Sequence, residues 1–229
     1  ISGPNKIELA QISGLLSNDN YQEAIVKTLE LNKNYPNVPL LFNILGVCYK
    51  SLGQIEDAAE MFKTAFTIKP DYAEAHFNYG VIMQEKNDLN QAVKSYNTAI
   101  KIEPMSPLVL NNLGLIYLKK NQLKKALKSF KLAISFFSGY AEAHNNLGAT
   151  LQELNQYELS KKEYLKAIKL NPEYFEAYDN LGNLYQSLGE ISKAKTNYEF
   201  SIKINENYAP AHFNLSQIKK YSYDDNQIK

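Results

Sequence analysis

The chain has 229 residues, of which 45% are hydrophobic and 21% charged, which is enough for one or two ordinary domains with a buried core. Its 25 basic and 24 acidic residues leave a net charge of +1, so no overall field attracts nucleic acid or an anionic membrane. Every basic residue is Lys, so the chain has no guanidinium group to clamp phosphates or guanine edges. We therefore expect no nucleic-acid partner.

The cysteine content and the hydropathy exclude two further classes of protein. A single cysteine, Cys48, rules out an intrachain disulfide and any metal cage built from several cysteines. No stretch approaches 18 uninterrupted apolar residues, and no signal-peptide pattern opens the chain. These features predict a cytoplasmic location and no insertion into a membrane.

A 34-residue repeat runs through the chain from residue 39 onward. An apolar residue followed by glycine recurs at this interval without an insertion, as Leu45-Gly46, Tyr79-Gly80, Leu113-Gly114, Leu147-Gly148 and Leu181-Gly182, and Leu215-Ser216 continues the series. Within each unit, apolar residues follow helical spacing in two blocks. The sequence therefore predicts five full units, each a pair of antiparallel amphipathic helices, at residues 39–72, 73–106, 107–140, 141–174 and 175–208.

The short turns and the packing positions follow the same period. The turn inside each unit carries a residue type that tolerates the left-handed conformation, namely Gly53, Asn87, Asn121, Asn155 or Gly189. Small and aromatic residues then alternate along the second helix, as with Ala58 and Phe62 in the first unit. This pattern predicts close helix packing with rings filling the gaps, which is a structural code rather than a catalytic one.

The arrangement resembles the tetratricopeptide repeat, whose pattern is met here by Phe42, Leu45, Gly46, Tyr49, Ala58, Phe62, Ala65 and Pro70. The resemblance implies an all-α fold, a right-handed superhelical solenoid of antiparallel helix pairs. Residues 1–38 fit the 34-residue pattern loosely, so we interpret them as a degenerate first repeat that caps the array. Residues 209–229 are expected to form a partial sixth repeat and a tail.

The sequence contains no pattern that indicates catalysis. Cys48 has no His or acidic partner at nucleophile spacing, and the chain has neither a phosphate-binding glycine-rich loop nor a zinc-binding His-Glu-x-x-His helix. The three histidines, His76, His144 and His212, stand two repeats apart, too far for one metal in stacked repeats, so we assign them to packing. We expect no enzyme activity, no cofactor and no metal in this chain.

One asparagine per repeat stands in fixed phase on the first helix, as Asn78, Asn112, Asn146, Asn180 and Asn214. In tetratricopeptide-like stacks the first helices line the concave surface, and the superhelical repeats of O-linked N-acetylglucosamine transferases have a similar ladder. An amide both donates and accepts, which suits the backbone of an extended peptide. The other interpretation is that these side chains bond to neighbouring helices.

The residues that flank this ladder differ between the two ends of the chain. The early part of the predicted groove is flanked by apolar side chains, among them Phe77, Val81, Leu108 and Leu115, whereas the later part carries Glu142, Asn145, Glu176, Asp179 and Asn183. We therefore expect the early part to prefer apolar side chains and the later part to prefer Lys or Arg.

The most specific interpretation is a non-catalytic scaffold that binds an extended peptide or partner segment in its concave groove. The alternative is a substrate-recognition module of a longer bacterial transferase, sulfotransferase- or glycosyltransferase-like, because the tail from Leu215 to Ile228 resembles segments that join such arrays to catalytic domains. The open ends of the array also predict end-to-end self-association, with Leu215 and Ile218 exposed on a helix that lacks its partner.

Overall fold

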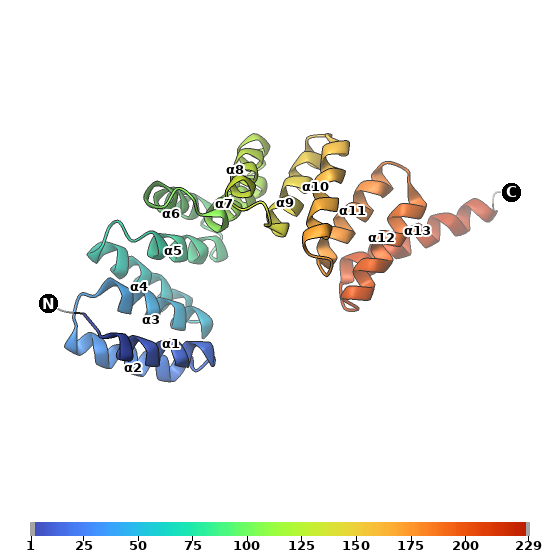
Figure 1. The fold of residues 1–229 in the computed structure, drawn as a ribbon. Helices are drawn as coiled ribbons and strands as arrows, with labels where there is room; N and C mark the ends of the chain where they lie inside the picture. The colour runs from blue at the N-terminus through green and yellow to red at the C-terminus, as the bar shows by residue number, and fades with distance from the viewer. Residues whose placement is uncertain (1–2, 228–229) are drawn as a thin grey trace. The chain divides into compact units, whose positions relative to one another are not determined.

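The computed structural model describes residues 3–227, with side chains described as far as Ile218, and this part of the chain contains thirteen α-helices and no strand. Figure 1 shows the helices in chain order. Their bounds are α1 Lys6–Ser17, α2 Tyr21–Asn34, α3 Pro39–Ser51, α4 Ile55–Ile68, α5 Ala73–Glu85, α6 Leu89–Ile102, α7 Pro107–Lys119, α8 Leu123–Phe136, α9 Ala141–Glu153, α10 Tyr157–Leu170, α11 Phe175–Ser187, α12 Ile191–Ile204 and α13 Ala209–Gln227. The predicted all-α repeat fold is confirmed.

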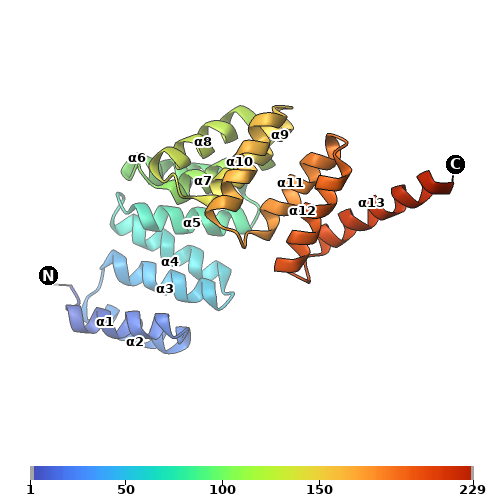
Figure 2. The ribbon, with the colours of Figure 1, turned by 45° about the vertical axis from the view of Figure 1, so that its right-hand side comes forward.

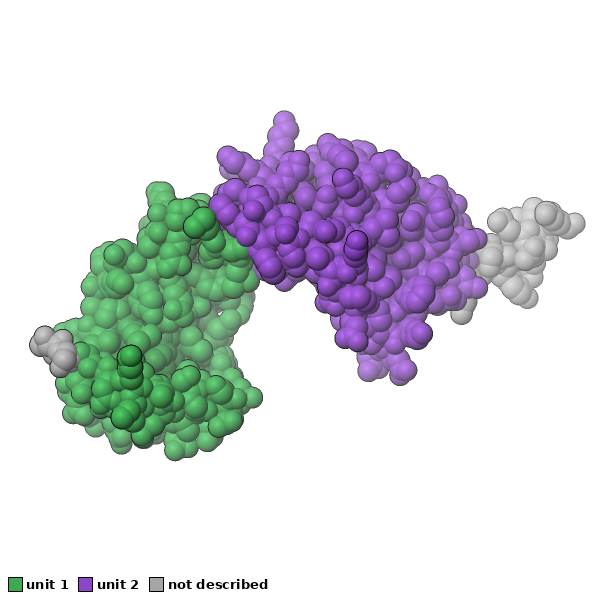
Figure 3. Space-filling model, in the orientation of Figure 1, with its two compact units in different colours: residues 1–109 green, residues 110–229 purple. Residues whose placement is uncertain are grey.

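The chain divides into two compact units, residues 1–109 and residues 110–229 (Figure 3). In the first unit, α3 packs against α4 and α5 against α6, and successive pairs lie side by side in both views (Figures 1 and 2). In the second unit, α9 pairs with α10 and α11 with α12 in the same way. Each repeat is thus a helix pair that buries its apolar faces against the next pair.

The turn inside each pair has the predicted left-handed residue. The backbone φ angle is positive at Gly53, Asn87, Asn121, Asn155 and Gly189, and also at Asp19 in the first pair. The residue after it donates its backbone N–H to the carbonyl five positions earlier, as from Gln54 to Tyr49 at 2.9 Å. This bond closes the end of the first helix, so that the chain reverses direction in a short turn.

The glycine of each repeat makes room for an aromatic ring from the paired helix. A Cβ atom built on Gly46 would lie 2.5 Å from the ring of Phe62, and one on Gly148 would lie 2.8 Å from the ring of Tyr164. The same holds for Gly80 with Tyr96, Gly114 with Phe130 and Gly182 with Tyr198. Because all five rings are fully buried, the predicted close approach of small and aromatic residues is confirmed.

The N-terminal residues form a helix pair that keeps the 34-residue spacing of the repeats. Asp19 stands one repeat length before Gly53 and has the same left-handed conformation, with φ of 56°. Ile12, which occupies the glycine position, is fully buried in a core cluster with Leu31 and Leu41. The interpretation of residues 1–38 as a degenerate repeat that caps the array stays a prediction.

The C-terminal helix corrects one expectation. Leu215 and Ile218 are buried against Ala194 and Tyr198 of α12, so the prediction that they are exposed is wrong. The reason is that α13 packs one face on the preceding repeat, which covers these two residues without a second helix. Ile228 lies outside the described residues. Within the described part of the chain, no helix has the length and apolar character needed to cross a membrane.

Candidate functional site: amide clamps and junction pockets

Four of the five ladder asparagines donate a hydrogen bond to the preceding repeat. The Nδ2 atom of each lies 3.0–3.1 Å from a side-chain oxygen of the residue 35 positions earlier in the sequence. The pairs are Asn78 with Asn43, Asn146 with Asn111, Asn180 with Asn145, and Asn214 with Asp179. Part of the hydrogen-bonding capacity of the ladder therefore holds neighbouring first helices together.

The acceptor residue in two of these pairs also donates back to the same helix. Asn43 accepts from Asn78 and donates to the Glu74 carboxylate at 3.0 Å, one helical turn before Asn78. Asn111 makes the equivalent bonds with Asn146 and Glu142, both at 3.0 Å. We call this three-residue arrangement an amide clamp. Because Asn43 and Asn111 are buried, the clamp satisfies polar groups that would otherwise be costly.

These hydrogen bonds leave part of the capacity of most ladder amides unused. Asn78, Asn146 and Asn180 are half-buried, and the bonds above use one N–H of each, so the amide oxygen and the second N–H stay available. Asn214 donates to both Asp179 and Asn183, at 3.1 and 3.0 Å. The alternative interpretation, bonding to neighbouring helices, thus describes what these four donors do in the structure.

Asn112 differs from the rest of the ladder. At the equivalent position of the preceding repeat stands Phe77, which has no acceptor, whereas the other repeats have Asn or Asp there. Asn112 is half-buried, and it makes no side-chain hydrogen bond to any described residue of its own unit. Its whole amide is therefore free within that unit.

Two of the predicted groove residues lie below the surface. Asn145 and Asp179 are about 5% and 4% exposed, and both are held by amides of the next repeat. Burial raises the pKa of Asp179, and the amides of Asn214 and Asn183 oppose this shift. Asn183 in turn accepts from the Tyr198 hydroxyl at 2.8 Å. The polar atoms of these residues are therefore bonded to side chains within the protein.

The first unit contains an apolar pocket beside the ladder. It has a volume of about 130 Å³ and is lined by Ala73, Glu74, Phe77, Ala99, Glu103, Ser106, Leu108 and Val109. The ring of Phe77 stacks on Tyr96 with 5.8 Å between centroids, which fixes the pocket wall. Val81 is half-buried on α5 outside this lining, and Leu115 packs on the core cluster of Phe130 in the second unit. Of the predicted apolar groove residues, Phe77 and Leu108 line the pocket.

The second unit contains an acidic pocket that brings two predicted residues together. It has a volume of about 370 Å³ and is lined by Ala141, Glu142, Asn171, Tyr174 and Glu176. Burial, and then the carboxylates of Glu142 and Glu176, raise the pKa of the Tyr174 hydroxyl well above its usual range. Glu142 is bonded to Asn111, whereas Glu176 makes no ion pair or hydrogen bond to any described residue.

The two pockets occupy the same place in the repeat. Ala73, Glu74, Glu103, Ser106 and Leu108 stand two repeat lengths before Ala141, Glu142, Asn171, Tyr174 and Glu176, and all five of the latter line the second pocket. Sequence reasoning missed the clamp residues Asn43 and Asn111 and the pocket residues other than Phe77, Leu108, Glu142 and Glu176. The signal that could have found the clamps was the periodic spacing of Asn43, Asn111, Asn145 and Asp179.

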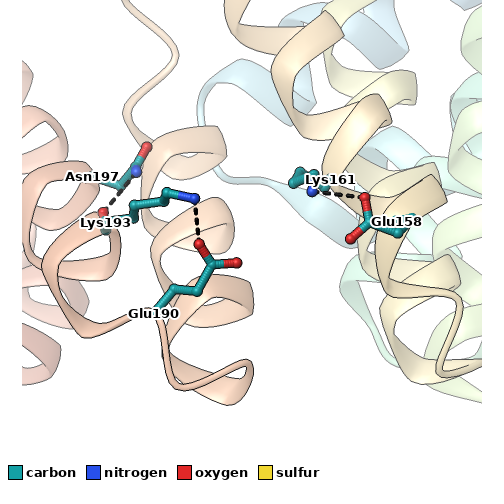
Figure 4. Close-up of polar contacts among 5 residues, drawn as sticks. All are labelled: Glu158, Lys161, Glu190, Lys193 and Asn197. Atoms are coloured by element: carbon teal, nitrogen blue, oxygen red, sulfur yellow. Dashed lines mark hydrogen bonds and ion pairs between the residues drawn. The ribbon is translucent and has the colours of Figure 1, made fainter.

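Some charged groups of the second unit pair between neighbouring turns. Lys161 donates to Glu158 at 2.7 Å on α10, Lys193 of α12 pairs with Glu190 at the start of that helix, and Asn197 donates to the Lys193 carbonyl at 2.8 Å (Figure 4). Such pairs between neighbouring turns contribute little to stability.

The histidines and the cysteine have structural surroundings. His76, His144 and His212 each place Nε2 against the carbonyl six positions earlier, at 2.9, 3.2 and 2.8 Å, which ties the connecting loop to the first helix. Burial raises the pKa of the Cys48 thiol to about 11, so the thiol is protonated at neutral pH. Among the described residues, no three His, Cys, Asp or Glu side chains group in a way that could hold a metal.

Comparison with protein families gives matches over most of the chain. A model described as TPR repeat matches residues 46–87, 84–121, 114–155 and 151–189, and one described as tetratricopeptide repeat matches residues 175–208. No curated protein matches the sequence.

Solved structures with the same fold are numerous. YrrB, described as a TPR protein with an unusual peptide-binding site, is 17% identical with a TM-score of 0.66, and the match covers 81% of this chain and 96% of YrrB. Pseudomonas aeruginosa PilF is 20% identical with a TM-score of 0.72, covering 82% of this chain and 86% of PilF. A repeat protein from Cytophaga hutchinsonii has the same identity and TM-score, covering 93% of this chain and 85% of its own. At this identity the likeness concerns the fold.

Proposed function

Because the chain belongs to the tetratricopeptide repeat family, a family of helical scaffolds for protein–protein interaction, we propose that it binds an extended peptide or partner segment along its first helices. The observation that carries the proposal is the pair of equivalent pockets beside the ladder, one apolar and one acidic. Pockets of different chemistry at the same position of a repeat suit the recognition of different side chains. The peptide-binding site named for YrrB supports the same class of ligand.

In this proposal, the ladder amides bind the peptide through those donors and acceptors that have no partner within the protein. Asn112 has a free amide within its unit, and Asn78, Asn146 and Asn180 each keep an oxygen and one N–H. A peptide backbone offers both donors and acceptors, so these groups can bind main chain without regard to side chains. The wall of the proposed groove is positioned by Asn145, Asp179 and Asn183. Apolar surface near the ladder comes from Val81 and Leu115.

The acidic pocket is proposed to take the cationic end of a Lys or Arg side chain of the bound segment. Glu176 is the more important carboxylate, because Glu142 already accepts from Asn111. Asn171 and the Tyr174 hydroxyl supply further polar atoms around it. A cation between these groups would gain charge-assisted hydrogen bonds of about 2.7–2.9 Å.

The experiment that tests peptide binding is a random peptide array probed with the purified chain, followed by titration of the strongest binder. The Asn112→Ala variant should weaken binding about fivefold, corresponding to one lost hydrogen bond of about 1 kcal/mol. Methylating the peptide's backbone amides should weaken it more than shuffling side chains that lie outside the pockets. Lys125→Ala, on the exposed face of α8, is the matched control and should bind as the wild type does.

An array without binders would contradict the proposed function. Binding that is unchanged by Asn112→Ala and by backbone methylation would leave peptide binding in place and remove the main-chain role of the ladder.

A second candidate function is substrate recognition for a transferase domain. It is favoured by α13, which has 19 residues where the five other complete first helices, α3, α5, α7, α9 and α11, each have 13. Reading the coding sequence beyond Lys229 tests it, since a catalytic domain there would support this function and another fold would refute it.

End-to-end self-association is proposed with Phe213 as its contact. Phe213 is 63% exposed on α13, although the equivalent residues Asn43, Asn111, Asn145 and Asp179 are buried by the next repeat. Sedimentation at increasing concentration should show a dimer that Phe213→Ser removes. A monomer at every concentration would refute this contact.

A further inference from the structure

The apolar pocket of the first unit has a defined size and a mixed rim. Its floor consists of Ala73, Ala99 and Val109, each at most about 5% exposed, and its walls are Phe77 and Leu108. The carboxylates of Glu74 and Glu103, both exposed, stand at its edge. An apolar floor with acidic groups at the rim favours a ligand that is apolar at one point and positively charged beside it.

The volume restricts the side chain that fits. A dry protein cavity of about 150 Å³ lined by aliphatic and aromatic groups holds one benzene molecule. The pocket here measures about 130 Å³, which suits a branched aliphatic side chain and is too small for an indole. Its open side faces solvent, so a side chain can enter without movement of the helices.

Ser106 is the residue that opens the pocket. The equivalent loop position is Tyr72, Tyr140, Tyr174 or Tyr208 in four other repeats, and in the acidic pocket the tyrosine itself is part of the lining. A serine lacks the ring, and Leu108 replaces the carboxylate of Glu176. These two changes convert a polar site into an apolar one on the same backbone.

We propose that this pocket binds a Leu- or Ile-sized side chain flanked by Lys or Arg in the partner segment. The inference rests on the proposed function, since it identifies one anchor residue of the bound segment. The apolar side chain is held by Phe77, Leu108 and Val109. The flanking cation faces Glu74 and Glu103, of which Glu74 keeps one carboxylate oxygen outside its clamp bond with Asn43.

The probe is a fluorescein-labelled nonapeptide of sequence Gly-Ser-Gly-Lys-X-Lys-Gly-Ser-Gly, with X as Ala, Leu or Trp. The Leu peptide should bind about tenfold more tightly than the Ala peptide, as expected for burying the extra apolar surface. The Trp peptide should bind no more tightly than the Ala peptide. Replacing both Lys by Glu in the Leu peptide should weaken binding about fivefold or more at low salt.

A double variant separates this pocket from every other binding surface. Ser106→Tyr with Leu108→Glu gives the pocket the residues of its acidic counterpart at these two positions and should abolish the preference for Leu over Ala. Lys94→Ala, an exposed change on α6, should keep the preference. Methyl NMR on the wild type gives a readout without mutation, because the Leu peptide should shift the Val109 and Leu108 methyl signals.

The outcomes distinguish the two proposals. Equal binding of the Ala, Leu and Trp peptides, with unshifted Val109 methyls, overturns the anchor pocket while peptide binding stands. Loss of the Leu preference in Lys94→Ala also overturns it, because the preference would then arise elsewhere. Failure of every peptide to bind, in the array and in this series, overturns both proposals.

Discussion

The pocket within residues 73–109 and the pocket within residues 141–176 lie at the same position in the repeat, and each has two glutamates in its lining, but the rest of the lining differs in polarity. Ser106 and Leu108 make the first pocket apolar, while Tyr174 and Glu176 make the second polar and acidic. The glycine, the buried ring and the turn residue are equivalent at both places. The difference teaches that a few side chains on an equivalent backbone change the polarity of a pocket.

The largest expected effect concerns the equivalent buried rings of the two units, Tyr96 and Tyr164. Tyr96→Ala in the first unit and Tyr164→Ala in the second should each lower the free energy of unfolding by about 3–5 kcal/mol, because each empties a fully buried ring position. Denaturant melts of both variants give the values. Tyr96→Phe and Tyr164→Phe are the controls and should cost about 1 kcal/mol for the lost hydroxyl bond. A small loss for either alanine variant would contradict the shared packing.

The clamp residue Asn43 and the equivalent residue Asn145, which has no carboxylate partner, should contribute differently to stability. Asn43→Ala leaves a carboxylate and an amide without their partner, so we expect a loss of about 2–3 kcal/mol in stability. Asn145→Ala removes bonds to Asn180 and to the Tyr174 hydroxyl, the latter long at 3.5 Å, and should cost about 1–2 kcal/mol. Thermal unfolding measures both. Equal losses would show that the carboxylate adds nothing to the clamp.

The acidic pocket can be tested through its free carboxylate. Glu176→Gln should weaken binding of a Lys-containing peptide about fivefold, or about 1 kcal/mol, since it removes the charge while keeping the shape. The effect should shrink at high salt, because part of the attraction is screened. Fluorescence anisotropy at two salt concentrations measures it, and Glu173→Gln, outside this pocket, is the control. An unchanged affinity in Glu176→Gln would remove the cation site.

The tyrosines at the loop position predict a pH dependence that Ser106 cannot have. Burial, and then the Glu142 carboxylate, raise the pKa of Tyr140 to about 12 from an ordinary value of 10.0. The folded state therefore favours the protonated hydroxyl. Its contribution is complete below pH 10 and is lost as the pH rises toward 12, by about 1 kcal/mol at pH 11. Tyr140→Phe should reduce this loss in alkaline melts, and an identical pH profile would contradict the shift.

The smallest effect separates Asn112 from the rest of the ladder. Asn112→Ala should change stability by no more than about 0.5 kcal/mol, because its amide is unpaired within its unit. Asn146→Ala should cost about 1 kcal/mol or more, since it leaves the buried Asn111 oxygen without a donor. Helix content should stay constant in both, because Ala is the better helix former. If both variants lose the same stability, Asn112 is bonded in solution.

The sequence predicted the repeat because its signals are local and periodic. The left-handed turn residues, the glycines and the rings each follow from what a single helix pair needs, so the repeating pattern specified them without knowledge of the structure. The position of the ladder and the acidic pair Glu142 and Glu176 were predictable for the same reason. Family comparison agrees with this interpretation over residues 46–208.

What the ladder asparagines do was decided by tertiary structure. An amide at Asn146 is bonded because Asn111 lies 3.0 Å away, and Asp179 is buried because Asn214 closes over it. The same is true of Leu215 and Ile218, which the preceding repeat covers. A periodic sequence places equivalent residues at equivalent positions, but the choice between a partner in the protein and one outside it depends on distances between the helices of successive repeats. Those distances arise only when the helices pack.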